Sequence, residues 1–350
     1  MSKNNFNTTI NNKEISLFTL KNNNGVKVEI TNFGGKVVSI HVPDKDGNIE
    51  DIVLGYDNID DYISGNPYFG AIVGRYANRI SKGKFTIEEK EYQLVQNNGE
   101  NHLHGGTKGF NDIVWDVKQT EVDGNQLLEL SYLSKDGEEN YPGNLNVKVI
   151  YTLTQNNELK IAYSASTDKT TIVNITHHSF FNLAGEGKGT ILDHKLLINA
   201  DKFTVVNNQS IPTGEIRNVA DTPMDFRKFT EIGERINADD EQLKFGNGYD
   251  HNWVLNRDLK KISFVAAVHE PISGRYMEVW TDQPGMQLYT GNYLDGSDIG
   301  KGEKAYHQHS AFCLETQHFP DSPNHPEFLS CILKPGEEYK QTCIYNFSVK

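Results

Sequence analysis

Apolar and polar side chains alternate with a period of two along most of this chain, and this pattern restricts it mainly to β-sheets. Every second residue between 145 and 153 is apolar, and the same alternation returns between residues 159 and 165. The segment Gln155-Asn156-Asn157 separates the two runs, and asparagine tolerates the positive φ of a tight turn. The pattern predicts a hairpin of two half-buried strands.

Turn signals follow one another at short intervals along the chain. Asp46-Gly47 lies between two apolar runs, and Asp136-Gly137 ends another. Helical spacing is rare, and its best candidate is the segment 229–236, with apolar residues at positions 229, 232 and 236. A propeller would need a repeat of fixed period, which the sequence lacks. We predict an all-β fold, a large antiparallel β-sandwich with few short helices, formed by residues 1–350 as a single domain.

The amino-acid composition argues against several classes of binding partner and cofactor. A net charge of −13 argues against nucleic-acid binding and, more weakly, against anionic membranes and highly phosphorylated substrates. The sequence has no apolar run of roughly 18 residues for a membrane span, and its N-terminus lacks the apolar core of a signal peptide. Three cysteines without a CxxC pair favour neither a disulfide framework nor a zinc site, so we expect a cytoplasmic protein. No nucleotide-binding glycine motif is present, and we expect no cofactor.

Several polar stretches interrupt the alternation, and their residue types can carry chemistry. They are GRYANRI (74–80), NNGENHLHGGTKGFN (97–111), NITHHSFFNLAG (174–185), GNGYDHNWVL (246–255), PGMQLYTGN (284–292) and LETQHFPDSPNHPEF (314–328).

Two pairs of histidines stand out in these stretches. His177 and His178 continue an apolar run and must point to opposite faces if extended, so only one of them can face a pocket. The following Phe180-Phe181 pair favours a pocket floor over a surface loop. His102 and His104 have a metal-site spacing, but no carboxylate follows within residues 105–109. We predict no metal and expect the glycines after His104 to turn its side chain into a cavity, while His102 and His177 receive no role.

The segment 314–328 combines Glu315 with apolar residues and three prolines. Prolines exclude a long helix or a central strand across this segment. We therefore expect Glu315 to leave the sheet at a strand end, in a loop that Phe319 and the prolines stiffen. Burial beside Phe319 would raise the pKa of this carboxyl group.

Taken together and in order, the motifs resemble the aldose 1-epimerase, or galactose mutarotase, family. The resemblance extends from about residue 14 to the C-terminus, and it rests on residues 32–40, 54–80, 97–110, 174–185, 249–253, 284–292 and 314–328. It implies the galactose mutarotase-like β-supersandwich and a cofactor-free reaction that interconverts the α and β anomers of free aldohexoses such as galactose and glucose. The implied partner is a small sugar, and the protein is expected to be a monomer or a homodimer.

The resemblance also implies roles for individual residues. By position, His178 corresponds to the general acid and Glu315 to the general base. The implied ligands of the sugar hydroxyls are Arg79, His104, Asp250 and Gln287, with Asn78 beside them. His177 is a departure, because many relatives have asparagine there.

These residue types suit the reaction. A pyranose ring opens when the C1 hydroxyl loses a proton and the ring oxygen gains one. A carboxylate is a suitable base at neutral pH, and a histidine with a reference pKa of about 6.5 keeps a protonated fraction that can act as the acid. Donors and acceptors around the ring would hold the other hydroxyls while the C1–C2 bond rotates.

Three other functions compete with this interpretation. A related epimerase of hexose 6-phosphates would need a cluster of cations near the pocket, for which the motifs offer only Arg75 and Arg79. A non-catalytic sugar-binding sandwich could dispense with the His178–Glu315 pair. A glycosidase would need two nearby carboxylates, which Glu315 and Asp250 could supply, but it would leave the histidines without a purpose.

Overall fold

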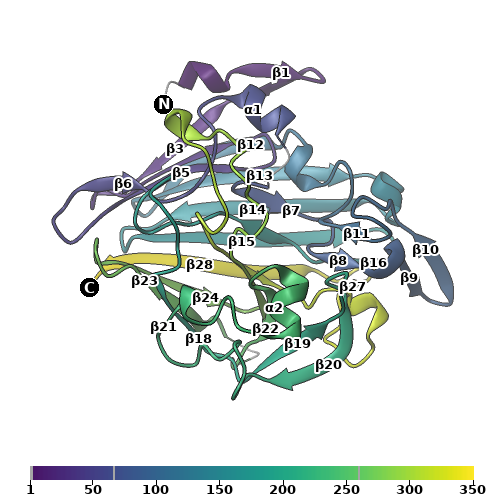
Figure 1. Ribbon diagram of the computed structural model, residues 1–350. Helices are drawn as coiled ribbons and strands as arrows, with labels where there is room; N and C mark the ends of the chain where they lie inside the picture. Colours follow the sequence, from purple (N-terminus) through teal and green to yellow (C-terminus); the bar gives the residue numbers. More distant parts are fainter. Residues whose placement is uncertain (1–2, 66–67, 259–260) are drawn as a thin grey trace.

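The computed structural model describes residues 3–65, 68–258 and 261–350, which form mainly antiparallel sheets. The largest sheet has nine strands (Figure 1). In spatial order they are β12 (Asp116–Val122), β13 (Asn125–Ser134), β14 (Leu145–Leu153), β15 (Glu158–Thr167), β28 (Tyr339–Val349), β24 (Arg275–Thr281), β23 (Ser263–His269), β18 (Lys195–Ile198) and β21 (Thr230–Glu231).

The hairpin predicted from the alternation is present as β14 and β15. The two strands pair from Leu145 opposite Thr167 to Leu153 opposite Leu159, and Asn157 takes φ 62° in the turn. Buried residues alternate with more exposed ones along both strands. One face of this part of the sheet therefore meets the core and the other meets water.

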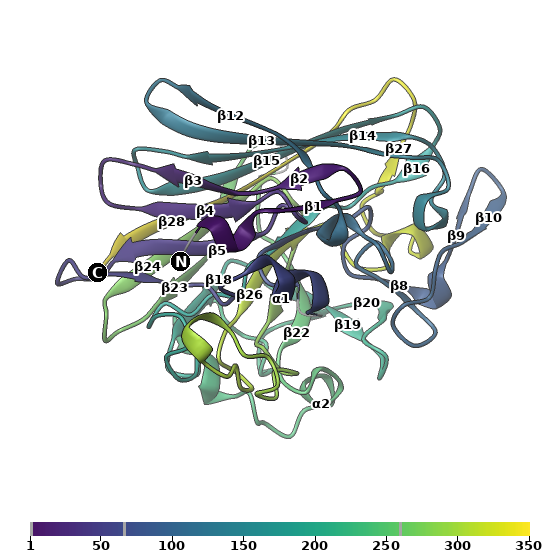
Figure 2. The ribbon, with the colours of Figure 1, turned by 90° about the horizontal axis from the view of Figure 1, so that it is seen from above.

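Two further sheets complete the framework. A five-stranded sheet has the order β20 (Pro212–Asn218), β19 (Lys202–Val206), β22 (Asp250–Val254), β25 (Gly285–Tyr289) and β26 (Cys313–Gln317). A four-stranded sheet has the order β3 (Leu17–Lys21), β4 (Lys27–Thr31), β5 (Val37–Pro43) and β6 (Ile49–Asp51). Strands β12–β15 and the five-stranded sheet lie on opposite sides of the molecule in both views (Figure 1, Figure 2).

The described residues also form five pairs of short strands. They are β1 (Thr8–Ile10) with β2 (Lys13–Ile15), β7 (Ala71–Val73) with β17 (Thr176–His178), β8 (Arg79–Ile80) with β11 (His102–Leu103), β9 (Lys84–Ile87) with β10 (Lys90–Gln93), and β16 (Thr171–Ile172) with β27 (Ile332–Leu333).

One hydrophobic cluster draws side chains from all three large sheets. It includes Ile40 from β5, Val149 from β14 and Leu314 from β26, each at most 1% exposed. Burying such side chains contributes roughly 1.5–3 kcal/mol each, so the sheets stabilise one another. The all-β sandwich predicted from the sequence is confirmed.

The predicted helix in residues 229–236 is wrong. Residues Thr230–Glu231 form β21, and only a 3₁₀ turn follows at Ile232–Glu234. The α-helices of the described residues are α1 (Ile59–Ser64) and α2 (Glu241–Gly246), and each begins after a residue whose side chain caps the free backbone N–H groups. Capping decides the position of these short helices, whereas apolar spacing alone does not.

The expectation for the start of the segment 314–328 is also wrong. Glu315 lies at the centre of β26, opposite Gln287 of β25, and all five residues of β26 are buried. The irregular part begins only after Gln317. A sheet that is buried on both faces can carry a carboxylate on one of them, provided that this face borders a polar cavity.

None of the described helices is long and apolar enough to cross a lipid bilayer.

The cap of α2 gives a test of this account. Asp240 accepts hydrogen bonds from the backbone N–H groups of Gln242 and Leu243 at 2.8 and 3.4 Å. We expect Asp240→Ala to lower the free energy of unfolding by about 1 kcal/mol in urea denaturation. The neighbouring Asp239 is exposed and forms a surface ion pair with Lys244, so Asp239→Ala is the matched control and should leave stability nearly unchanged. Equal losses in both variants would contradict the capping role.

Candidate active site

A cavity of about 680 Å³ opens between the five-stranded sheet and the short strands β8, β11 and β17. Both polar and aromatic side chains line it. The polar and charged ones include Asn78, Arg79, Asn98, His104, His178, Asn208, Gln209, Asp250, Asp295 and Glu315. The cavity thus joins most of the residues that the sequence motifs single out.

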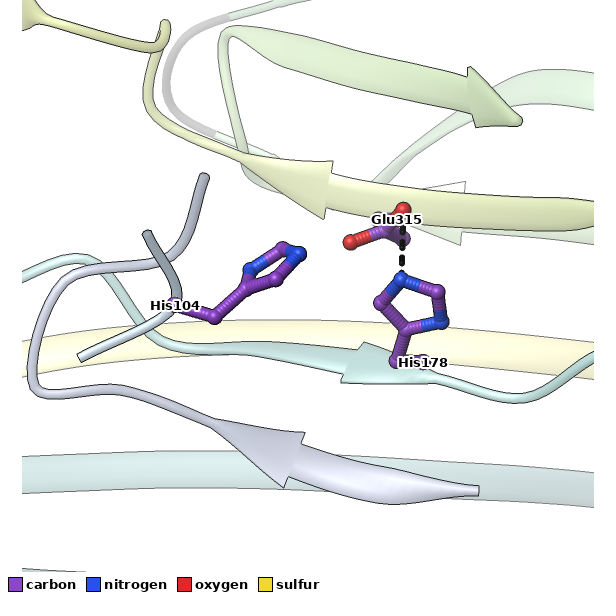
Figure 3. Close-up of side chains that lie close together, drawn as sticks. All are labelled: His104, His178 and Glu315. Carbon is purple, nitrogen blue, oxygen red and sulfur yellow. Dashed lines mark ion pairs between the residues drawn. The ribbon is translucent and has the colours of Figure 1, made fainter. Parts of the chain in front are cut away.

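His178 and Glu315 meet inside this cavity. His178 Nε2 lies 3.4 Å from Glu315 Oε1, and their side chains are 7% and 2% exposed. Figure 3 shows the imidazole rising from β17 towards the carboxylate on β26, with His104 beside them. Two residues 137 positions apart in sequence are therefore brought into direct contact (315 minus 178).

Burial shifts the proton affinities of this pair in opposite directions. It raises the pKa of Glu315 well above its ordinary value, and the nearby Asp250 raises it further. It lowers the pKa of His178 to about 4. Each shift disfavours the charged form of the group. For a proton that the two groups share, both shifts favour its position on the carboxyl group over the imidazole, the reverse of an exposed histidine beside an exposed carboxylate.

His104 reaches the cavity because the chain turns sharply after it. His104 has φ 53° and Gly105 has φ 91°, and a Cβ on Gly105 would lie 1.8 Å from the carbonyl oxygen of Gly74. The backbone N–H of Asn78 donates to His104 Nδ1 at 3.1 Å. Burial lowers the pKa of His104, so the ring is neutral and carries its proton on Nε2. His104 is consequently fixed as a hydrogen-bond donor.

Arg79 and Asp250 form the opposite polar wall. Arg79 Nη1 lies 3.6 Å from Asp250 Oδ2. Gln287 donates to Asp250 Oδ1 at 2.7 Å, but it does not line the cavity. The structure therefore places Asn78, Arg79, His104 and Asp250 in the cavity wall. Gln287 lies outside the lining and is hydrogen-bonded to Asp250.

Comparison with known proteins gives one consistent result. The family model described as aldose 1-epimerase matches residues 16–346. Galactose mutarotase from Bos taurus is 48% identical over 93% of this chain and 92% of its own length, and aldose 1-epimerase from Escherichia coli K12 is 38% identical over 95% and 94%. The crystal structure of galactose 1-epimerase from Lactobacillus acidophilus is 30% identical, has a TM-score of 0.87 and covers 98% of this chain and 97% of that chain.

The chain belongs to the aldose 1-epimerase family. The resemblance drawn from the motifs is thereby confirmed.

Both histidines that received no role from the sequence of this aldose 1-epimerase family member lie away from the cavity. His102 contacts the carbonyl of Val95 and the hydroxyl of Tyr141, both at 2.6 Å. His177 points to the core face of β17 and contacts Ser179 Oγ at 2.7 Å. Their buried nitrogens are thus partnered within the protein. The two histidines of β17 do point to opposite faces, as the alternation predicts.

Arg75 likewise serves the structure. It is 2% exposed and donates to the backbone carbonyls of Ser134, Pro142 and Gly143. Among the described residues that line the cavity, Arg79 is the single lysine or arginine.

The aromatic part of the cavity was only partly predicted. Phe180 stacks on His178 with ring centroids 5.0 Å apart, whereas Phe181 packs into the core against Phe312 and Tyr345. The Phe-Phe pair was thus a correct signal for a pocket floor at Phe180. Tyr68 and Tyr289 also line the cavity and were missed. Tyr289 lies two residues after Gln287 on β25, so period two placed it on the same face.

The ligand atoms of His104, His178 and Glu315 lie within 4.8 Å of one another, a grouping that suits a metal ion. The hydrogen bond from Asn78 argues against one, because it occupies Nδ1 of His104 and leaves the proton on Nε2. A metal needs an unprotonated nitrogen. His104 would have to lose this bond or its Nε2 proton before it could bind a metal.

We therefore expect prolonged incubation with a strong chelator to leave the epimerase rate unchanged, measured by polarimetry against an untreated sample. Loss of activity that added Zn²⁺ restores would contradict this interpretation of His104.

Proposed function

We propose that this protein interconverts the α and β anomers of free aldohexoses such as galactose and glucose, with Glu315 as the general base and His178 as the general acid. The family assignment makes the chain an isomerase, an aldose 1-epimerase. The single observation that supports the two residue roles is the 3.4 Å approach of His178 Nε2 to Glu315 Oε1 inside a polar cavity.

The reaction needs two proton transfers on one sugar ring. Glu315 takes the proton of the C1 hydroxyl while His178 gives a proton to the ring oxygen, and the C1–O5 bond breaks. The C1–C2 bond of the open-chain aldehyde rotates and presents the other carbonyl face. Closure reverses both transfers: His178 takes back the proton from the C5 hydroxyl, and Glu315 returns one to O1. No proton is gained or lost overall, and the ring and open-chain forms are isomers at the same oxidation level, so the proposed steps consume no oxidant or reductant.

The single proton of the pair fits this cycle. With the sugar in its ring form, the proton sits on the imidazole; after opening, the carboxyl group holds it. Opposite pKa shifts stabilise the second of these states relative to the first, whereas in water the carboxylate and imidazolium would be favoured. Desolvation therefore favours the proton transfers that open the ring, and general acid–base catalysis of this kind contributes about 10²–10⁴-fold per group.

Four residues are proposed to hold the remaining hydroxyls. Arg79 and Asp250 supply a charged donor and acceptor, His104 supplies a neutral donor, and Asn78 lies beside them. Gln287, expected from the sequence to bind sugar directly, is proposed to act through Asp250, to which it donates. These contacts would keep the open-chain sugar in the cavity while its C1–C2 bond rotates.

The rival functions find less support. A hexose 6-phosphate would need more positive charge than Arg79 provides among the described lining residues, since Arg75 is turned into the protein. A binding-only protein would have no use for a buried imidazole and carboxylate in contact. A glycosidase would employ Glu315 and Asp250, but Asp250 is engaged by Arg79 and Gln287.

The setting of the protein is also a proposal. Residues 1–350 are proposed to form one domain, because one hydrophobic cluster spans all three large sheets. A cytoplasmic location agrees with three buried cysteines that are all free. The proposed partner is the sugar, and the protein is proposed to be a monomer or a homodimer.

Glu315→Gln tests the assigned base. The amide preserves shape but cannot take a proton, so kcat should fall by about 10²–10⁴-fold while sugar affinity changes little. Polarimetry on freshly dissolved α-galactose and α-glucose measures the rate, and calorimetric titration measures binding.

Glu270→Gln is the matched control for that substitution. Glu270 is also buried, at 4% exposure, but it accepts from the backbone N–H groups of Ile272 and Ser273 and does not line the cavity. This control should keep the wild-type kcat. A wild-type kcat in Glu315→Gln would contradict the role of Glu315 as the general base.

The pH dependence gives a second test. The active pair holds one proton, so activity should fall on the acid side only when a second proton binds, near the pKa of about 4 of His178. On the alkaline side it should fall only at the raised pKa of Glu315. We expect kcat/KM to stay level from about pH 5 through pH 7, after subtraction of the uncatalysed rate. A tenfold fall per unit above pH 6.5 would instead indicate an ordinary imidazolium acid.

A further inference from the structure

The second nitrogen of the His178 ring has a partner that the proposed reaction does not use. Cys313 Sγ lies 3.5 Å from His178 Nδ1. The cysteine is fully buried, with 0% exposure, and it does not line the cavity. Its thiol therefore faces the imidazole from the protein side, while the carboxylate of Glu315 faces the other nitrogen.

The spacing on β26 explains how one strand reaches both nitrogens. Cys313 and Glu315 are two residues apart, so they lie on the same face, roughly 6.6 Å apart along the strand. The hydroxyl of Thr176 donates to the carbonyl of Thr316 at 2.9 Å and ties β17 to β26. This places the ring of His178 between the two side chains.

Phe180 restricts the ring from a third direction. Its ring stacks on the imidazole at 5.0 Å with planes 27° apart. Rotation of His178 about its side-chain bonds would break the stack, the thiol contact and the carboxylate contact together. The imidazole is thus fixed in plane and in direction.

We propose that Cys313 is a positioning residue that accepts a hydrogen bond from Nδ1–H of His178, fixes Nε2 towards Glu315 and the sugar, and keeps the imidazole a strong acid. The inference rests on the proposed function, because it needs His178 to exchange a proton through Nε2.

Proton counting supports the direction of this bond. The proton that the pair shares has two positions. In one it is on Nε2 of His178; in the other it is on the Glu315 carboxyl group, and Nε2 accepts a hydrogen bond. Nδ1 then carries a hydrogen throughout the cycle, and sulfur is its acceptor. A sulfur atom is a weak acceptor, so it orients the ring while stabilising the imidazolium less than an oxygen would. A carboxylate in this place would hold the proton too firmly.

Other titratable groups face His178 from the surrounding elements and contribute equally in the variants compared below. They are Glu315 on β26, Asp250 on β22, Arg79 on β8, His104 after β11, His177 on β17, Tyr289 on β25 and Tyr68 before β7. Only the acceptor at Nδ1 changes between Cys313→Ser and Cys313→Ala.

The experiment measures pH profiles of kcat and KM for the wild type, Cys313→Ser, Cys313→Ala and the control Cys331→Ser. Cys331 is also buried, but it packs in a separate hydrophobic cluster with Tyr76 and Tyr141 and does not line the cavity. We expect Cys313→Ala to lower kcat by roughly 10-fold, with KM changed less than about twofold, because the ring loses its orienting partner. The serine oxygen is the stronger acceptor, so Cys313→Ser should move the acid limb of the profile, which His178 sets, to higher pH, and Cys313→Ala should move it to lower pH.

Opposite shifts in the two variants, with Cys331→Ser unchanged, support the proposal. Profiles that coincide with wild type in both Cys313 variants overturn it, as does a loss of thermal stability and kcat without a shift in either limb, since that result describes packing alone.

A measurement on the unmodified protein covers the case in which a variant does not fold. Nitrogen-15 NMR of histidine-labelled protein, with the His178 signals assigned from their absence in His178→Gln, reports the tautomer directly. Protonated Nδ1 at pH 7 supports the proposal, and unprotonated Nδ1 overturns it. This measurement does not depend on turnover, so it separates failure of the Cys313 role from failure of the proposed function, which Glu315→Gln tests.

Discussion

The contact between β17 and β26 is the constraint on which the site depends. Thr176 donates to the carbonyl of Thr316 at one end, and at the other end Phe181 and Phe312 exchange backbone hydrogen bonds at 2.7 and 2.9 Å. His178 lies between these two ties and is therefore held opposite Glu315. Neither strand is long. β26 pairs with β25 at the edge of the five-stranded sheet, and β17 pairs with the short strand β7. Chemistry that requires placement within a few tenths of an ångström is thus built on backbone pairing rather than on loops.

Burial then gives the placed groups their reactivity. A carboxylate beside an imidazole in water would form an ordinary ion pair, with the proton firmly on the histidine. At 2% and 7% exposure the charged forms lose solvation, which raises the pKa of Glu315 and lowers that of His178. Both shifts favour the proton on the carboxyl group, which is where the proposed ring opening places it. The same desolvation keeps His104 neutral, so it acts as a donor without adding a second positive charge beside Arg79.

The sequence predicted the sheets well, because a strand with one buried face has apolar residues at every second position. Strands β14 and β15 show this alternation along most of their length. It failed where a strand is covered on both faces. In β26 the alternation separates Leu314, in the core, from Glu315, at the cavity, and both count as buried. Composition alone made such a segment resemble a loop, and the prolines at 320, 323 and 326 reinforced the error although they lie beyond the strand. The helix at 229–236 failed for a related reason: local spacing was satisfied, but β18 offered Thr230–Glu231 a pairing edge.

The prediction of site residues had a comparable limit. Motif order brought together residues that the fold places around one cavity, yet it could not distinguish a residue that faces the cavity from one that supports it. Gln287 and Asp250 show the difference, because both belong to polar stretches and only the second reaches the cavity. The strand register decides such cases. Gln287 pairs with Asn252 on one side and with Glu315 on the other. Its side-chain amide donates to Asp250 and accepts from Gln317, so both ends of the amide have partners within the protein. Cys313 is the extreme example. No feature of its local sequence distinguishes it. Its proposed role arises because Cys313 and Glu315, both on β26, contact the two ring nitrogens of His178 on β17.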